Sequence, residues 1–215
     1  QYYRCGPHAV IAKRGEGCTA MAYTFGIVLF DNAEELDWAG PWEVFGAAAQ
    51  MNHEDKVVTI AQHDRPIKCA KGLCVLADHT FENAPKLDVV LVPGGQGTRK
   101  EVNNPVLIEW LQKIAPECKW VTSVCTGALV LHGAGFTKGK RVTTYWGFVD
   151  QLRERGDVTV LENMRYVQDG NLVTAAGVSA GIDMALWLIG QIHSPEFARR
   201  IQQYIEYYPQ PPYEE

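Results

Sequence analysis

The sequence predicts an α/β protein in which helices sandwich a mainly parallel sheet. Two observations lead to this prediction. Short, continuous apolar runs, typical of strands buried on both faces, alternate along the chain with segments of helical character. Proline, glycine and capping residues fall where these strands would end and these helices would begin. In such folds ligands bind beyond the carboxyl ends of the strands.

The first half of the chain contains four predicted strands and two predicted helices. Pro41 predicts a helix that runs to residue 50 with the proline in its first turn. Asn104 and Pro105 cap a helix over residues 106–114. The strands expected here cover residues 25–30, 56–61, 87–92 and, as a short antiparallel excursion, 73–77.

The second half predicts further strands and a helical end. Asp169-Gly170 is the strongest hairpin signal in the sequence, and it joins two short strands on either side. Ser179 is the expected cap of a helix over 180–193, and Ser194 starts a last helix that ends before Pro209. The remaining elements are a strand over 119–124 and a buried helix over 126–133.

Composition restricts the class of protein. The chain has 215 residues, a formal charge of −5 and 47% apolar residues, which is ordinary for a globular protein. It contains no basic stripe, so nucleic acid is an unexpected partner, and no run of about 18 apolar residues that would cross a membrane. We expect a small-molecule pocket in a single domain over residues 21–215. Residues 1–20 lack periodicity and are expected to be a leader, a tag or an extension.

The six cysteines show no pattern of a zinc site or a disulfide framework. Their scattered positions favour mostly buried thiols in a reducing, cytoplasmic setting and speak against a metal site. No cofactor is expected.

One cysteine is placed differently from the others. Cys125 follows an apolar strand and precedes a helix that opens on Thr126 and Gly127, which is the arrangement of a nucleophile elbow with sulfur in place of the serine hydroxyl. A helix N-terminus would lower the pKa of the thiol and favour the thiolate. The alternative is a buried structural cysteine. Gly94 and Gly95, at the end of a neighbouring strand, could direct backbone N–H groups at charge developing beside the sulfur, although glycine pairs are also plain turns.

Asp37 is the candidate proton donor. It lies between the apolar residues Leu36 and Trp38, directly before the predicted helix. Local pattern fits an N-cap as well as a catalytic carboxyl. If Asp37 faces Cys125, the two groups would titrate as a coupled pair and give a thiolate beside a protonated acid.

Six motifs in this order resemble the ThiJ/PfpI superfamily, and among its branches they are most similar to isocyanide hydratases. The resemblance spans nearly all of residues 21–213. The motifs are Leu36-Asp37-Trp38-Ala39-Gly40-Pro41, Leu91-Val92-Pro93-Gly94-Gly95, Thr122-Ser123-Val124-Cys125-Thr126-Gly127, Thr143-Thr144-Tyr145-Trp146, Ala176-Gly177-Val178-Ser179-Ala180-Gly181-Ile182-Asp183 and Tyr208-Pro209-Gln210-Pro211-Pro212-Tyr213.

The resemblance implies a flavodoxin-like three-layer sandwich and a homodimer without metal. It implies Cys125 as nucleophile, Asp37 as general acid/base, Thr126 as the residue that fixes the cysteine loop, and Gly95 as a backbone donor. The implied reaction is that of a hydro-lyase, which hydrates an isocyanide to an N-substituted formamide through a Cys thioimidate.

The chain departs from the family pattern at two positions. Thr126 stands where peptidase-like members carry histidine, so a Cys-His peptidase pair is not expected. Tyr145 stands where related hydratases often carry histidine, which leaves the substrate open. Tyr145 and Trp146, followed by Trp38, are the expected aromatic walls of the pocket, although aromatic residues often only fill cores.

Two other classes of function remain open. The fold also occurs as the ligand-sensing half of transcription regulators, and a redox-sensing thiol or another cysteine-based hydrolase or glyoxalase-like activity would use the same cysteine. We expect a free-standing enzyme because no basic helical region follows the predicted domain.

Overall fold

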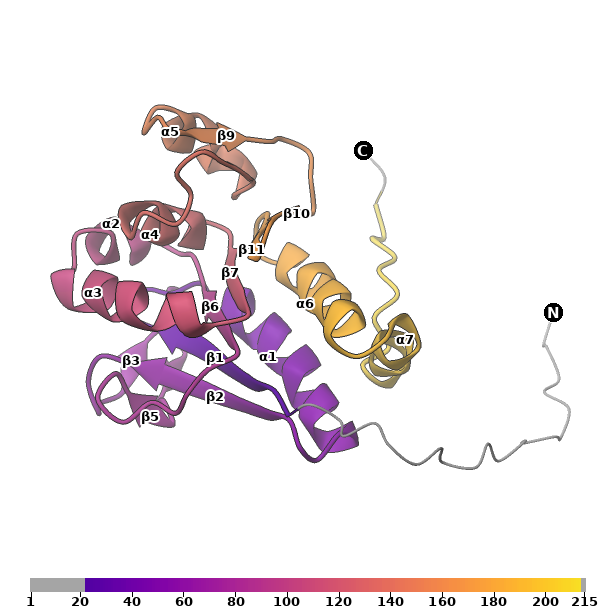
Figure 1. Cartoon of the computed structure of the whole chain (residues 1–215). Coiled ribbons are helices and arrows are strands. Elements are labelled where there is room, and N and C mark those ends of the chain that lie inside the picture. Colours follow the sequence, from indigo (N-terminus) through magenta and orange to yellow (C-terminus); the bar gives the residue numbers. More distant parts are fainter. Residues whose placement is uncertain (1–21, 214–215) are drawn as a thin grey trace, which may run out of the picture.

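Within residues 22–213, which this computed structural model describes, a seven-stranded sheet forms the centre of the molecule (Figure 1). Its strands are β1 (Thr24–Leu29), β2 (Lys56–Ala61), β5 (His79–Thr80), β6 (Val89–Val92), β7 (Trp120–Val124), β10 (Tyr166–Asp169) and β11 (Leu172–Ala175). The strand order is β10-β11-β7-β6-β1-β2-β5. Only the pair of β10 with β11 is antiparallel in this sheet of the described chain. The predicted parallel sheet and the hairpin at Asp169-Gly170 are confirmed.

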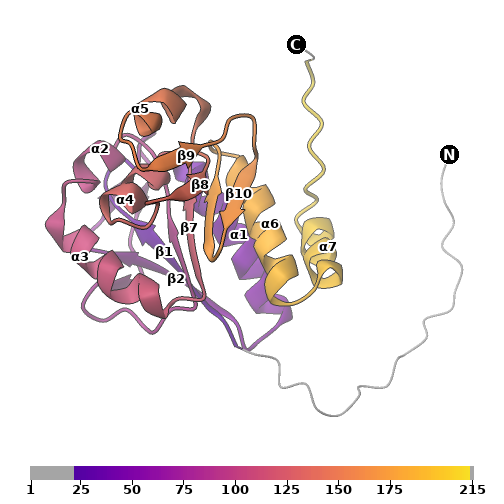
Figure 2. The same cartoon turned by 45° about the horizontal axis from the view of Figure 1, so that its top comes forward.

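Helices cover both faces of the sheet and complete the flavodoxin-like sandwich. Helices α1 and α6 lie side by side on one face with α7 packed outside them, and α2, α3 and α4 lie on the other face (Figures 1 and 2). The helices are α1 (Glu35–Met51), α2 (Thr98–Glu101), α3 (Pro105–Ile114), α4 (Gly127–Gly133), α5 (Val149–Arg153), α6 (Ala180–Ile192) and α7 (Pro195–Tyr204), with 3-10 turns at Ala115–Glu117 and Trp146–Phe148.

Two small pairs of strands lie outside the main sheet. The first is antiparallel and joins β3 (Ile67–Lys68) to β4 (Cys74–Val75), which confirms the predicted excursion. The second is parallel and joins β8 (Lys140–Val142) to β9 (Val158–Val160) beside α5 (Figure 2). These two strands and α5 are short and have little apolar periodicity, so hydrophobic periodicity alone does not predict them.

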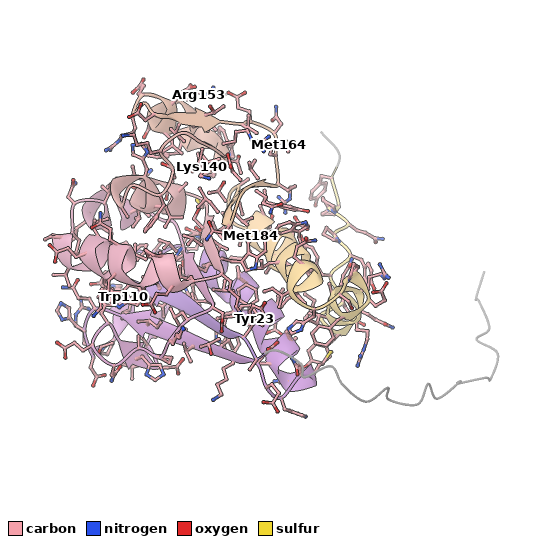
Figure 3. The ribbon with its side chains drawn as sticks, in the orientation of Figure 1. Tyr23, Trp110, Lys140, Arg153, Met164 and Met184 are labelled. Carbon is pink, nitrogen blue, oxygen red and sulfur yellow. The ribbon has the colours of Figure 1, made fainter. Side chains whose placement is uncertain are left out.

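The core forms where the apolar runs meet the helices. Val89–Val92 of β6 are buried at every position, as expected for a central parallel strand. The rings of Phe25 in β1 and Phe45 in α1 stack with their centroids 4.4 Å apart. Met184 of α6 is fully buried in the interior, whereas Met164 is exposed at the periphery (Figure 3).

The helix α1 begins at Glu35 rather than at Pro41, so the predicted position of the proline was wrong. Pro41 lies inside the helix, where it leaves the carbonyl of Asp37 without its usual helical partner. Its ring packs tightly against α6, because a Cβ added at Gly181 would lie 3.1 Å from Pro41 Cγ. Tertiary packing therefore overrides the local preference of proline for a helix start.

The predicted caps have mixed outcomes. Asn104 and Ser194 accept hydrogen bonds from the backbone N–H groups of Val106 and Phe197, as expected. Ser179 is at the N-cap position of α6, as expected, but its side chain makes no capping hydrogen bond, and its hydroxyl accepts one from Arg165 instead.

The structure describes four of the six cysteines. Cys69, Cys118 and Cys125 are buried, and Cys74 is exposed. Residues 1–20 and the prediction of a leader, tag or extension lie outside the described residues. Among the residues described, no helix is both long and apolar enough to span a bilayer.

Candidate active site

The predicted site residues meet at the carboxyl ends of three adjacent strands, β7, β6 and β1. Cys125 follows β7, the Pro93-Gly94-Gly95 turn follows β6, and Asp37 lies in the first turn of α1 after β1. The chain leaves β1 toward β2 on one side and returns through β6 on the other, so this edge is the topological switch point where α/β folds bind ligands.

Cys125 has the strained backbone of a nucleophile elbow. Its φ of 58° is in the left-handed region, which is uncommon for a residue with a side chain. The backbone N–H of Cys125 donates to the carbonyls of Ala175 (3.1 Å) and Ala176 (3.0 Å), and its own carbonyl accepts from Thr144 Oγ1 at 2.7 Å. The next helix begins at Gly127, where only glycine fits, because a Cβ at this position would lie 2.1 Å from the carbonyl oxygen of Val92. The predicted elbow is therefore present.

Asp37 is a completely buried carboxyl that faces Cys125. Its Oδ2 accepts a hydrogen bond from the N–H of Gly94 at 2.8 Å, while Oδ1 has no hydrogen-bond partner among the described residues. Glu34, not Asp37, is the N-cap residue of α1, so the N-cap interpretation of Asp37 was wrong. A buried carboxyl with an unpartnered oxygen is costly, which favours a functional role for Asp37.

The pair holds its protons strongly. Burial raises the pKa of Asp37 from 3.8 to about 7, partly offset by the N–H groups of Gly94 and Val178 and by the Cys125 thiol. Burial, together with the negative charge of Asp37, raises the pKa of Cys125 from 9.0 to about 12. The predicted lowering of the thiol pKa by the helix N-terminus was wrong, because the Thr126 N–H is outweighed by burial. Since an ionised Asp37 disfavours a thiolate, the thiolate requires a protonated Asp37.

Thr126 fixes the loop that carries the cysteine. Its Oγ1 accepts a hydrogen bond from the N–H of Gly95 at 3.1 Å and contacts Thr98 Oγ1 at the same distance. The N–H of Gly95 is thus bonded to Thr126, and the N–H of Gly94 is bonded to Asp37. The two predicted backbone donors therefore hold the site residues in place rather than pointing freely at the sulfur.

A cavity of about 300 Å³ opens above Cys125. Tyr145 lines it, as predicted. Trp146 instead lines a neighbouring cavity of about 720 Å³, and its side chain is 80% exposed. Its ring lies 5.3 Å from that of Tyr145, between centroids. Trp38 is buried in the core and lines neither cavity, so the structure does not bring it to the site.

The cavity is also lined by residues that were not predicted from the sequence, namely Glu34, Gln96, Arg99 and Val178. Val178 has a φ of 49°, which is a strained conformation for a β-branched residue. Its position could have been found from the hairpin, because β11 pairs with β7 and its carboxyl end must lie beside Cys125. Arg99 follows the glycine turn in the short helix α2, and its approach to the cavity had no signal in the sequence.

Two further polar side chains, those of His132 and Asp183, have structural partners. His132, on α4, is bonded through Nδ1 to Thr137 Oγ1 at 2.8 Å. Asp183 accepts a hydrogen bond from Arg165 Nε at 2.6 Å. Neither lines the cavity at Cys125.

The fold and the site define a class of α/β protein in which a cysteine on a nucleophile elbow faces a buried carboxyl. A family model described as the DJ-1/PfpI family matches residues 25–191. The chain belongs to the DJ-1/PfpI family, as the six motifs predicted.

Several relatives show how closely the chain resembles characterised members. It is 37% identical to the isonitrile hydratase of Pseudomonas putida over 194 residues, which cover 90% of this chain and 82% of that protein. The crystal structure of a THiJ/PfpI family protein from Pseudomonas syringae superimposes with a TM-score of 0.85 at 28% identity, covering 96% of this chain and 85% of the other. The HTH-type transcriptional regulator CdhR of Pseudomonas aeruginosa is 30% identical over 64% of this chain and 41% of its own length.

Proposed function

We propose that this protein is a cysteine-dependent hydratase that converts an isocyanide into an N-substituted formamide. The observation that carries the proposal is the buried contact between the Cys125 thiol and the Asp37 carboxyl, whose pKa is raised to about 7, so that the pair can exchange a proton as the sulfur attacks. Similarity to the isonitrile hydratase of Pseudomonas putida over most of both chains supports the same reaction.

The pair can perform both halves of the reaction. The thiolate of Cys125 adds to the terminal carbon of R–N≡C, and the proton on Asp37 passes to that carbon, which gives the thioimidate R–N=CH–S–Cys. Asp37, now a carboxylate, accepts a proton from a water molecule while the oxygen of that water adds to the same carbon. Breakage of the C–S bond then returns the electron pair to sulfur, and the proton of the newly added hydroxyl moves to nitrogen to give R–NH–CHO, which leaves Asp37 protonated and Cys125 a thiolate again.

The surrounding residues position these two groups. The N–H of Gly94 orients the Asp37 carboxyl, and Thr126 fixes the Cys125 loop through the N–H of Gly95. Tyr145 forms one wall of the substrate cavity. The reaction as written needs neither a metal nor a cofactor. A homodimer and a cytoplasmic location stay predictions.

The test is formamide formation from a panel of alkyl and aryl isocyanides. The intact protein should turn over at least part of the panel, and Cys125→Ala and Asp37→Asn should each lose most of the rate. Cys118→Ala, which removes a buried thiol just before the start of β7, at the opposite end of that strand from the site, is the matched control and should keep the rate. Turnover that survives in Cys125→Ala would refute the mechanism.

A ligand-sensing function is the second candidate. The similarity to the regulator CdhR favours it, because a domain of this family can serve a protein that regulates transcription. The two functions separate in the same experiment. A sensor would bind small molecules at Cys125 and slow its alkylation without releasing any formamide.

A further inference from the structure

Arg99 places a positive charge at the cavity above Cys125. Its Nη1 donates to the carbonyl of Gly95 (3.1 Å) and lies within hydrogen-bond distance of Thr98 Oγ1 (3.1 Å) and Thr126 Oγ1 (3.3 Å). Its guanidinium carbon lies 4.7 Å from the centre of the Phe148 ring, a cation–π distance. The side chain is exposed, yet these contacts hold its charged end in one place.

The charge of Arg99 has no paired carboxylate in the described part of the chain. Among residues 22–213, Arg99 forms no ion pair, and its Nε and Nη2 have no hydrogen-bond partner. Glu34, the acidic residue that lines the same cavity, is already paired with Lys71. An immobilised guanidinium with free N–H groups is suited to a carboxylate, which it can bind through two parallel hydrogen bonds.

The charges of the site also determine how a charged substrate is oriented in the cavity. The catalytic pair carries negative charge whenever it has lost a proton, so an anionic group would be repelled from the end of the cavity at Cys125. The same group would be attracted to Arg99. A substrate with an uncharged reacting end and a negative far end therefore fits the cavity in one direction only.

We propose that Arg99 is a specificity-determining residue and that the substrates of this site are small isocyanides whose R group carries a carboxylate. The proposal rests on the proposed function for the reacting isocyanide group, but not for the anion-binding role of Arg99. The cavity of about 300 Å³ is at the lower end of the size of ligand sites, which limits the R group to a few heavy atoms.

Anion binding can be tested without any turnover. Iodoacetamide should reach Cys125 through the cavity and the exposed Cys74 from solvent, and peptide mass spectrometry follows both in one sample. Butyrate should slow alkylation at Cys125 but not at Cys74, and the neutral butyramide should need a concentration about tenfold higher for the same protection, as expected for one charge-assisted contact. Arg99→Gln should abolish the difference. Lys100→Gln, which removes the neighbouring cation outside this cavity, should keep it.

The catalytic test compares a carboxylate-bearing isocyanide with its methyl ester. In Arg99→Gln the ratio of the two kcat/KM values should fall about tenfold, mainly through the KM of the acid, whereas Lys100→Gln should leave the ratio unchanged. Looser positioning of Thr126 would slow both substrates alike and cancel in the ratio. Arg99→Lys should keep part of the preference, because it keeps the charge but loses the planar fork.

The outcomes separate the two proposals. If the intact protein hydrates acid and ester equally well, or if butyrate and butyramide protect Cys125 equally, the role of Arg99 is refuted and the hydratase function stands. If no isocyanide is hydrated, the proposed function fails, and the protection of Cys125 by butyrate still decides whether Arg99 binds anions.

Discussion

Replacing Asp37 by asparagine should make the protein more stable at neutral and alkaline pH while removing its activity. Asparagine has the same shape and can still accept the hydrogen bond from Gly94, but it carries no charge. The wild-type carboxyl is completely buried, and its pKa is raised from 3.8 to about 7. Between pH 4 and pH 7, Asp37 is therefore mostly protonated in the folded protein and mostly ionised in the unfolded chain.

The size of the effect follows from this rise in pKa. At about 1.4 kcal/mol per pH unit, the rise corresponds to about 4 kcal/mol of unfolding free energy that the wild type lacks once Asp37 is ionised. Between pH 4 and pH 7 the folded protein binds more protons at this site than the unfolded chain does, so wild-type stability falls as pH rises. The variant should match the wild type near pH 4 and exceed it by up to about 4 kcal/mol near pH 8.

Urea unfolding of both proteins across pH 4 to 8 measures the difference. Asp55→Asn is the control, because Asp55 is also buried but has partners for both oxygens, the N–H of Tyr23 (2.9 Å) and His193 Nε2 (2.7 Å). It should lose about 1–3 kcal/mol because it weakens charge-assisted hydrogen bonds. If the Asp37→Asn and wild-type stability curves stay parallel across this range, the carboxyl does not have a raised pKa and the reasoning is wrong.

Three further predictions follow from the site. The kcat/KM for hydration should rise as pH passes about 7 and then level off, since the pair must lose one proton to hold a thiolate beside a protonated Asp37; a pH–rate profile checks this. Gly94→Ala should lose about 1–3 kcal/mol in urea unfolding, because its Cβ would lie 2.5 Å from the backbone nitrogen of Thr126 and 2.8 Å from Asp37 Oδ2. Gly46→Ala, whose Cβ meets its nearest atom at 4.0 Å, should lose nothing. Thr126→Val should lose about 1–3 kcal/mol by leaving the Gly95 N–H unpaired, and Thr126→Ser should lose less, again by urea unfolding.

The sheet and the elbow could be predicted from the sequence because their signals are local. Strands β1, β6 and β7 are mainly apolar and buried on both faces, and each is followed within two residues by a glycine or a polar residue. Once the strands are parallel, the loops after them must meet at one edge, which brings Cys125 and Asp37 together without any knowledge of distances.

The features that could not be predicted depend on packing between distant segments. Pro41 is accommodated inside helix α1 because the proline ring fits against Gly181 of α6, about 140 positions away in the sequence. Arg99 reaches the cavity through contacts with Gly95, Thr126 and Phe148, of which only Gly95 is near in sequence. No local pattern reports such contacts.

The same limit explains why the thiol pKa was predicted in the wrong direction. A helix N-terminus is visible in the sequence, but the burial of Cys125 and Asp37 is not, and burial has the larger effect on both pKa values. The predicted backbone donors cannot compensate, because Gly94 and Gly95 already hold Asp37 and Thr126. The proton on Asp37 is then the main means by which a thiolate can exist at Cys125. A carboxyl with an ordinary pKa would lose this proton well below neutral pH. The burial that makes Asp37 destabilising is therefore the same feature that lets it act as the proposed proton donor.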